Sequence, residues 1–187
     1  MGMSSLATTG VLVGLWPDVA VPQLASDFEA VYSEHADGVY RFCLSQLRDA
    51  ALAEDVAAEV FASAYAAWSR TAFDTDGGVR PWLYRIARNA VCDEWRRRGR
   101  ASHAREFTPR SADVETMVAV REELRAVIAA FGALRERDRI LLGLRLAGGL
   151  SHAEVAAVVG MSERAAIVAS GRALERLRSR LVGEGWA

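Results

Sequence analysis

Apolar residues recur along most of the chain at intervals of three and four positions, the spacing that brings side chains to one face of an α-helix. The first such stretch begins at Asp27, which we expect to cap the helix, and continues to Leu47 as one long helix or two short ones. A second helix is predicted from about Leu52 to Trp68, and a third from Pro81, a residue suited to a first helical turn. Alternation of apolar and polar residues, which would predict strands, is hard to find.

The second half of the chain carries four further helical patterns, at residues 114–131, 134–146, 151–159 and 163–181. The last two are separated by Gly160-Met161-Ser162 and have the length and punctuation of a helix-turn-helix. Ser151, followed three residues later by Glu154, makes a capping box for the first of them, and Ser162 is placed to cap the second. We therefore predict an all-α protein.

Interruptions of the helical pattern predict two small domains joined by a flexible linker. Periodicity lapses after Arg100, in a polar and Arg-rich stretch that contains Pro109. Before Asp27, the apolar run from Val11 to Trp16 lacks the basic start of a signal peptide and is too short to span a bilayer. We interpret this opening stretch as a flexible or partner-binding extension, or as the product of a misassigned start codon. The predicted units are an extension (1–26), a first domain (27–100), a linker (101–116) and a second domain (117–187).

Charge is strongly segregated along the chain, although the formal net charge is only -1. Residues 27–79 hold ten acids against three arginines, whereas residues 80–110 hold nine arginines against three acids. Within this basic block, Arg96-Arg97-Arg98-Gly99-Arg100 lies at the C-terminal end of the third predicted helix, where the helix dipole also favours cations. A concentrated block of this kind indicates a nucleic-acid partner.

The sequence offers few residues for catalysis or metal binding. Cys43 and Cys92 are far apart, and no His lies at ligand spacing from either, so we expect two buried, reduced cysteines and no metal or cofactor. No His/Cys/Asp cluster, Gly-rich phosphate loop or paired-carboxylate motif is found. These absences argue against an enzyme.

Three stretches share residues with a known family. They read Ala-Glu-Asp-Val-Ala-Ala-Glu-Val-Phe at 53–61, Pro-Trp-Leu-Tyr-Arg-Ile-Ala-Arg-Asn at 81–89 and Gly-Leu-Ser-His-Ala-Glu-Val-Ala at 149–156. On these motifs the chain resembles, from Asp27 to Leu181, the extracytoplasmic-function group of the sigma-seventy class. The resemblance implies a region 2 helical bundle in the first domain and a region 4 helix-turn-helix in the second.

The first stretch resembles the family's segment that docks on the clamp coiled coil of the polymerase β′ subunit. Taken alone, an acidic helix face here would be an ordinary solvated face, so the docking role rests on the resemblance. The implied polymerase-binding residues are Glu54, Asp55, Glu59 and Phe61.

The second stretch resembles the family's promoter-melting and minus-ten segment, with the core Trp-Leu-x-x-Ile-Ala-x-Asn. Opening a duplex exposes unstacked bases, which aromatic faces and hydrogen-bonding pockets receive. The resemblance implies that Asn89 and Phe73 help to hold a flipped base while arginines grip phosphates. Without it, Trp82 and Tyr84 would be interpreted as core aromatics at helical spacing. The implied minus-ten residues are Phe73, Trp82, Tyr84, Arg85, Arg88, Asn89, Arg96, Arg97 and Arg98.

The third stretch resembles the start of the family's minus-thirty-five reader, but the recognition helix departs from the pattern. Where the family usually reads Gly-Thr-Val-Lys/Arg-Ser-Arg, this chain reads Arg-Ala-Ala-Ile-Val-Ala, with Ile167, Val168 and Ala169 at the last three positions. Each lost bidentate base contact removes about 1–3 kcal/mol of discrimination, so minus-thirty-five reading should be weaker or altered. The remaining candidates for that contact are Ser162, Arg164, Ser170, Arg172 and Arg176.

The same departure leaves an apolar surface to explain. Ala166, Ser170, Ala173, Leu174 and Leu177 already make a core face at three-four spacing, so we expect Ile167 and Val168 to be exposed. Exposed apolar patches tend to mark interfaces. We hypothesise a protein partner at this surface, such as an anti-sigma factor or a polymerase-bound activator.

The leading functional prediction is a cytoplasmic sigma factor. It would bind core RNA polymerase through the β′ clamp and the β flap, recognise and melt promoter DNA, make or break no bond, and insert in no membrane. One alternative is a helix-turn-helix regulator that binds duplex DNA as a dimer without polymerase, although this does not explain the minus-ten motif. Another is a sigma-like adaptor or inhibitor that keeps polymerase docking but has lost promoter reading.

Overall fold

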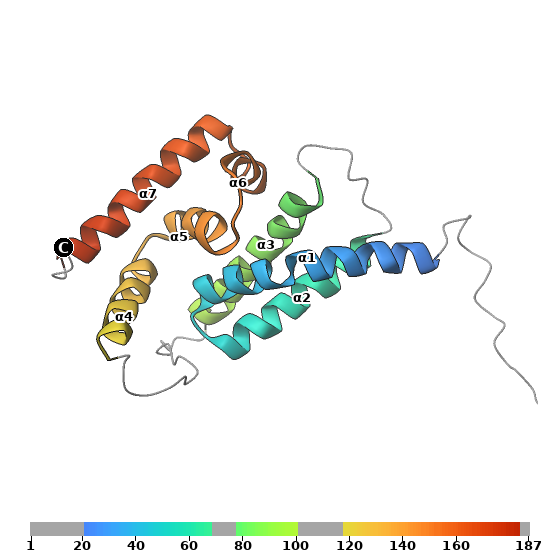
Figure 1. Cartoon of the computed structure of the whole chain (residues 1–187), viewed down its shortest axis with the longest axis horizontal. Helices are drawn as coiled ribbons and strands as arrows, with labels where there is room; N and C mark the ends of the chain where they lie inside the picture. Colours follow the sequence, from blue (N-terminus) through green and yellow to red (C-terminus); the bar gives the residue numbers. More distant parts are fainter. Residues whose placement is uncertain (1–20, 69–77, 101–117, 184–187) are drawn as a thin grey trace, which may run out of the picture.

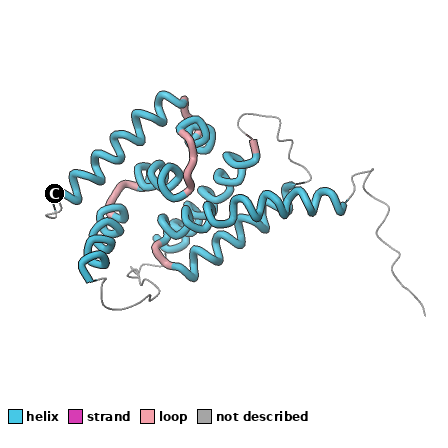
Figure 2. Tube along the Cα trace, in the orientation of Figure 1, coloured by secondary structure: helices cyan, strands magenta, loops and turns pink. Residues whose placement is uncertain are grey.

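The computed structural model describes residues 21–68, 78–100 and 118–183, and these residues form helices joined by short turns, with no strand among them (Figures 1 and 2). The prediction of an all-α protein is confirmed for this part of the chain. The helices are α1 (Val21–Leu47), α2 (Ala50–Trp68), α3 (Val79–Arg100), α4 (Val118–Gly132), α5 (Glu136–Leu142), the π-helix η1 (Gly143–Ala147), α6 (His152–Val159) and α7 (Glu163–Gly183).

The ends of two helices differ from the predictions. α1 begins at Val21, so Asp27 lies inside the helix and its predicted capping role is wrong. Pro22 explains the earlier start, because its fixed φ suits a first helical turn. The helix expected at 134–146 begins at Glu136 and changes at Gly143 into a π-helix, in which the Gly148 N–H donates to the Gly143 carbonyl at 2.9 Å.

The first three helices pack into a bundle. α2 lies along α1, and α3 contacts both of them (Figure 1). Their shared core is made of apolar side chains that recur at helical spacing, because only one stripe of each helix faces inward. The fully buried members include Val39, Phe42, Val60, Leu83 and Val91.

The helix-turn-helix has the caps that the sequence predicts. The Ser151 hydroxyl accepts from the Glu154 N–H at 3.1 Å, and the Ser151 N–H donates to the Glu154 carboxylate at 2.6 Å, which completes the capping box. α6 ends at Gly160, whose φ of +74° is a left-handed conformation that glycine adopts without strain. The Ser162 hydroxyl accepts from the Ala165 N–H at 3.3 Å at the start of α7.

The two halves of the chain share one continuous core. Phe42 and Tyr84 of the first bundle belong to the same buried cluster as Leu144, Leu150 and Val155 of the second half. α3 contacts α6, and α1 contacts η1, so the second half folds back onto the first (Figure 1). The predicted linker at 101–116 lies outside the described residues, and the division into two domains stays a prediction.

Candidate nucleic-acid and polymerase interface

The acidic docking segment lies on the outer side of α2. Glu54, Asp55 and Glu59 are exposed because the opposite stripe of α2 packs into the bundle. Phe61 differs from them, since it is only 7% exposed and meets the ring of Tyr32 edge-on, with the ring centroids 4.7 Å apart. Phe61 therefore supports the helix packing rather than presenting a free surface.

Two exposed aromatic side chains lie beside this acidic face, and neither was predicted from the sequence. Tyr32 of α1 and Tyr65 of α2 each expose about half of their surface, at 50% and 56%. Both take part in an aromatic cluster, because Tyr65 lies edge-on to Phe28 at 5.2 Å. Tyr65 follows Phe61 by one helical turn, so helical spacing could have indicated that Tyr65 belongs to this aromatic cluster. Tyrosine is enriched in protein interfaces, so Tyr32 and Tyr65 are further candidates for contact with a protein partner.

The predicted minus-ten residues are divided between two sides of α3. Arg85, Asn89 and Arg96 are exposed and lie on one stripe of the helix. Trp82 is half-buried and its ring lies 6.2 Å from that of Trp68, whereas Tyr84 on the other side is 1% exposed. Phe73 lies outside the described residues. In this conformation Asn89 and Arg96 are exposed on this stripe, whereas Tyr84 is buried.

The arginine block at the end of α3 is largely neutralised by acids within the chain. Arg96 pairs with Asp93 at 2.5 Å, an exposed contact of little energetic weight. Arg97 and Arg98 both contact Glu94, at 3.1 Å and 3.0 Å, and Glu94 is itself buried. Among the described residues no ion pair involves Arg88, which is half-buried on the edge of the exposed stripe. A phosphate contact by Arg97 or Arg98 would therefore have to compete with Glu94.

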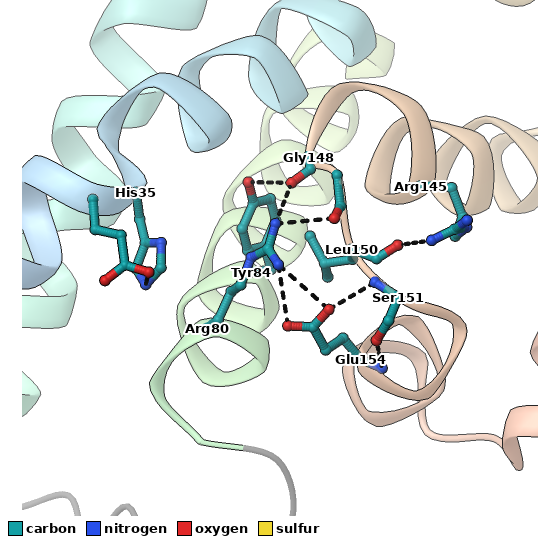
Figure 3. A network of polar contacts seen from close by, with 10 residues as sticks. His35, Arg80, Tyr84, Arg145, Gly148, Leu150, Ser151 and Glu154 are labelled. Atoms are coloured by element: carbon teal, nitrogen blue, oxygen red, sulfur yellow. Dashed lines mark hydrogen bonds and ion pairs between the residues drawn. The ribbon is translucent and has the colours of Figure 1, made fainter.

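A network of polar contacts joins α3 to the turn between η1 and α6 (Figure 3). One amino group of Arg80 lies 3.3 Å from the Glu154 carboxylate, and the other donates to the carbonyls of Gly148 and Gly149 at 2.9 Å and 3.0 Å. The Tyr84 hydroxyl also donates to the Gly148 carbonyl, at 3.1 Å. A side chain on Gly148 would come within 2.7 Å of the Tyr84 ring, so this approach depends on glycine. We call these five residues the latch.

Electrostatics reinforce the latch. Burial alone would raise the pKa of Glu154, but hydrogen bonds from Ser151 and Arg80 lower it below its usual value, so the carboxylate stays charged beside the guanidinium. Burial raises the pKa of Tyr84 to about 12, which keeps its hydroxyl protonated and able to donate. The sequence contains no local pattern that would indicate this pairing, because Arg80 and Glu154 are far apart along the chain.

Three further polar contacts cross between the halves. Arg85 donates to the Ala157 carbonyl at 3.4 Å, and Arg41 donates to the Ala147 carbonyl at 3.3 Å. Gln46 donates to the carbonyl of Arg139 at 3.2 Å, and the guanidinium of Arg139 lies 4.3 Å from the centre of the Trp95 ring. Two predicted minus-ten residues, Tyr84 and Arg85, thus bind the second half of the chain here.

An apolar cavity of about 320 Å³ also lies where the halves meet. Its walls come from α1, α4 and η1, and they include Leu44, Phe131 and Leu146. Arg41 and Arg48 are the cations at its lining. Cavities of this size between domains are common binding sites.

The recognition helix α7 presents a mixed surface. Ile167 and Val168 are exposed to 48% and 45%, which confirms that expectation. Leu174 was predicted on the core face but is 51% exposed, because it lies on the outer side of the helix next to Ile167. Ser170, predicted both as a core position and as a DNA contact, is 6% exposed and cannot reach DNA in this conformation.

The remaining minus-thirty-five candidates have different surroundings. Arg164 and Arg172 are exposed. Arg176 contacts both oxygens of Asp138, at 3.1 Å and 3.0 Å, and Ser162 caps α7. A cavity of about 190 Å³ between α5 and α7 is lined by four arginines, and their grouping was not predicted. The signal in the sequence was the spacing of Arg172 and Arg176, which are one helical turn apart. The four arginines are Arg135, Arg137, Arg172 and Arg176.

The described residues contain no group of three or more His, Cys, Asp or Glu side chains that could hold a metal ion. Among those same residues, no helix is long and apolar enough to cross a membrane.

Comparison with known proteins shows the family to which this chain belongs. A family model for Sigma-70 region 2 matches residues 31–101. The ECF RNA polymerase sigma factor SigL of Mycobacterium tuberculosis is 31% identical over 146 residues, which cover 74% of this chain and 80% of SigL. The chain belongs to the ECF sigma factors. Within that family, the RNA polymerase sigma factor CarQ of Myxococcus xanthus is 32% identical over 159 residues, covering 84% of this sigma factor and 90% of CarQ.

Solved structures agree with this assignment. The structure of CnrH in complex with the cytosolic domain of CnrY matches this sigma factor with a TM-score of 0.65 and 28% identity, covering 87% of this chain and 94% of that one. The sigma factor RpoE of Bartonella quintana, solved with the anti-sigma factor NepR, has a TM-score of 0.68 at 22% identity and covers 83% of this chain and 97% of that one. The latter likeness shows that the fold is shared.

Proposed function

We propose that this sigma factor binds core RNA polymerase through the acidic face of α2 and opens promoter DNA with the exposed stripe of α3. The observation that carries the proposal is the stripe itself, in which Asn89 lies between Arg85 and Arg96 within the region 2 match. An amide beside two guanidinium groups offers hydrogen bonds to an unstacked base and charge to its phosphates. The protein makes or breaks no bond, and it acts in the cytoplasm together with the polymerase.

We propose that this conformation is a closed form in which promoter opening is hindered. Tyr84 and Arg85 both donate to carbonyls of the second half, and α6 covers the adjacent side of α3. Arg85 would have to share its guanidinium between a phosphate and the Ala157 carbonyl, which lies 3.4 Å from one amino group. We therefore propose that the two halves separate when the sigma factor engages promoter DNA, and that the latch sets the free energy of that separation.

A regulator that binds both halves would favour the closed form. The apolar cavity between α1, α4 and η1 suits such a partner, because filling it buries surface contributed by both halves. CnrH, at 28% identity, is solved in complex with the cytosolic domain of CnrY. On these grounds we propose an anti-sigma factor as the regulatory partner of this chain.

Region 4 supports a second candidate function. Ile167 and Val168 stand where the family pattern has a cation and a serine, and Leu174 adds further exposed apolar surface, which favours an adaptor that docks on polymerase with reduced or altered minus-thirty-five reading. Among the predicted contacts Arg164, Arg172 and Arg176 are exposed, and Arg176 is paired with Asp138. Binding to polymerase without initiation at any promoter would favour this adaptor over a sigma factor.

Run-off transcription with core polymerase on a promoter library distinguishes these functions. The full chain should direct initiation at a subset of promoters. Asn89→Ala should reduce open-complex formation about tenfold or more while leaving polymerase binding unchanged, because a base contact is lost and α2 is untouched. Asp55→Arg should reduce polymerase binding instead, since it reverses a charge on the docking face. An Asn89→Ala variant that initiates normally would contradict the assignment of this stripe.

The matched control for both variants is Asp37→Ala. Asp37 is an exposed acid on α1, five residues beyond Tyr32 and therefore on a different side of that helix, and it lies outside the α3 stripe. It should leave polymerase binding and open-complex formation at the level of the unmodified chain. Equal losses in all three variants would indicate general damage rather than two separate surfaces.

A further inference from the structure

Five positions of α7 form one narrow exposed stripe. Glu163, Ile167, Gly171, Leu174 and Arg178 follow each other at intervals of four, four, three and four residues, which keeps them on one side of an α-helix. All five are exposed, and the helix lies along the outer edge of the molecule (Figure 1). The buried side of α7 is formed by Ala166, Ser170, Ala173 and Leu177.

The stripe is self-complementary when the helix direction is reversed. Its acid and its arginine stand at opposite ends, each four residues from an apolar side chain, and Gly171 lies near the middle. In an antiparallel pair of such helices, Ile167 of one copy faces Leu174 of the other, and Glu163 faces Arg178. Both contacts occur twice, as they must in a two-fold symmetric interface.

We infer that α7 pairs antiparallel with α7 of a second copy of this chain. Among the described residues neither Glu163 nor Arg178 has an ion-pair partner within the chain, so both charges are available. A Cβ placed on Gly171 would meet nothing within 4 Å, and the missing side chain lets a second backbone approach at the crossing point. The pairing would cover Ile167 and Leu174, which are otherwise exposed apolar surface.

The proposed interface is small, and it overlaps the part of α7 that would bind DNA. Two helices that meet over four turns bury less than the ~1,200 Å² of a standard interface, so association is weak, with a dissociation constant of ~10 µM or above. The covered stripe runs from Glu163 to Arg178, so it includes the N-terminal half of α7, which the helix-turn-helix would present to DNA. Pairing and minus-thirty-five binding therefore exclude each other. The pairing itself does not rest on the proposed promoter function.

Sedimentation velocity of the full chain over a range of concentrations tests the pairing. The unmodified chain should shift from monomer to dimer in the micromolar range. Glu163→Arg and Arg178→Glu should each weaken association about tenfold, because each places like charges opposite one another at both ends. An equimolar mixture of the two variants should regain association, since each end of the mixed pair then joins a guanidinium to a carboxylate.

Two controls show whether the charge variants act through this interface. Leu124→Ser removes an apolar side chain of similar exposure, 52%, on α4 and should leave association unchanged. Circular dichroism melting should show that both charge variants remain folded, since the two residues are exposed. A chain that stays monomeric at all concentrations overturns the inference. So does a mixture that associates no better than its components, a result that would instead favour a different protein as the occupant of the stripe.

Discussion

Tyr84 shows how one residue can satisfy a family motif and still have a structural role. It lies within the segment that resembles the promoter-melting motif, but its ring is buried and its hydroxyl donates to the Gly148 carbonyl. The contact brings residues 64 positions apart in the chain into hydrogen-bond distance. Local spacing correctly places Tyr84 on α3, whereas its partner depends on the packing of the second half.

His35 makes the stability of the folded chain depend on pH. It is 9% exposed, and burial lowers its pKa from the ordinary value, with Arg80 lowering it further and Glu34 and Glu154 opposing them. A lowered folded-state pKa means that the unfolded chain binds the proton first as the pH falls. The stabilisation from neutral His35 is therefore complete above about pH 6.5 and is lost as the pH falls below that value.

Urea unfolding at pH 7.5, 6.5 and 5.5 checks this expectation. The free energy of unfolding should fall toward pH 5.5 more steeply in the unmodified chain than in His35→Gln, which cannot titrate at this position. The difference between the two proteins isolates His35 from other titrating groups. Parallel pH profiles would show that burial of His35 does not contribute to the loss.

At the scale of elements, the helices follow from apolar spacing and their ends follow from capping residues. Ser151, Glu154 and Gly160 were sufficient to position the helix-turn-helix, because caps act through contacts only a few residues apart. The start of α1 and the π-helix were not predicted. The first coincides with a proline upstream of the expected start, and the second is marked by the hydrogen bond from the Gly148 N–H to the Gly143 carbonyl.

Among the site residues, too, features that follow from local spacing could be predicted, whereas contacts between distant elements could not. Exposure of Ile167 and Val168 could be predicted because their neighbours fill the buried side of α7. The prediction for Leu174 was wrong because this residue borders that side, where helical spacing alone does not decide burial. The pairing of Arg176 with Asp138 joins two elements that no local pattern connects.

Two glycine-to-alanine substitutions, one in the turn between α6 and α7 and one in α3, should change the free energy of unfolding in opposite directions. Gly160→Ala should lower the free energy of unfolding by about 1 kcal/mol, because a left-handed φ strains any residue with a Cβ. No atom lies within 4 Å of that Cβ, so the cost is conformational alone. Gly99→Ala, at an equally open position inside α3, should raise the free energy of unfolding by about 0.5–1 kcal/mol. Urea unfolding of both variants is the measurement, and equal signs would contradict the assignment of the cap.

At the scale of the whole molecule, the proposed separation of the halves exchanges one set of contacts for another. The structure buries a core shared by both halves and engages Arg80, Tyr84 and Arg85, whereas the proposed promoter binding uses α3 without α6 against it. A partner that binds only the open form must supply the free energy of separation, so its apparent affinity falls by the fraction of molecules that are open. Weakening the latch should therefore strengthen DNA binding.

Arg80→Ala tests this coupling, because it should strengthen DNA binding, whereas the loss of a positive charge alone would weaken it. Removing a cation normally weakens binding to DNA, as expected for Arg125→Ala, an exposed arginine on α4 away from the latch. Arg80→Ala also removes the contacts to Glu154, Gly148 and Gly149, which favours the open form. We expect binding to a minus-ten single strand, measured by fluorescence anisotropy, to become about three- to tenfold tighter in Arg80→Ala and no tighter in Arg125→Ala. If both variants bind more weakly by the same factor, separation of the halves does not limit DNA binding.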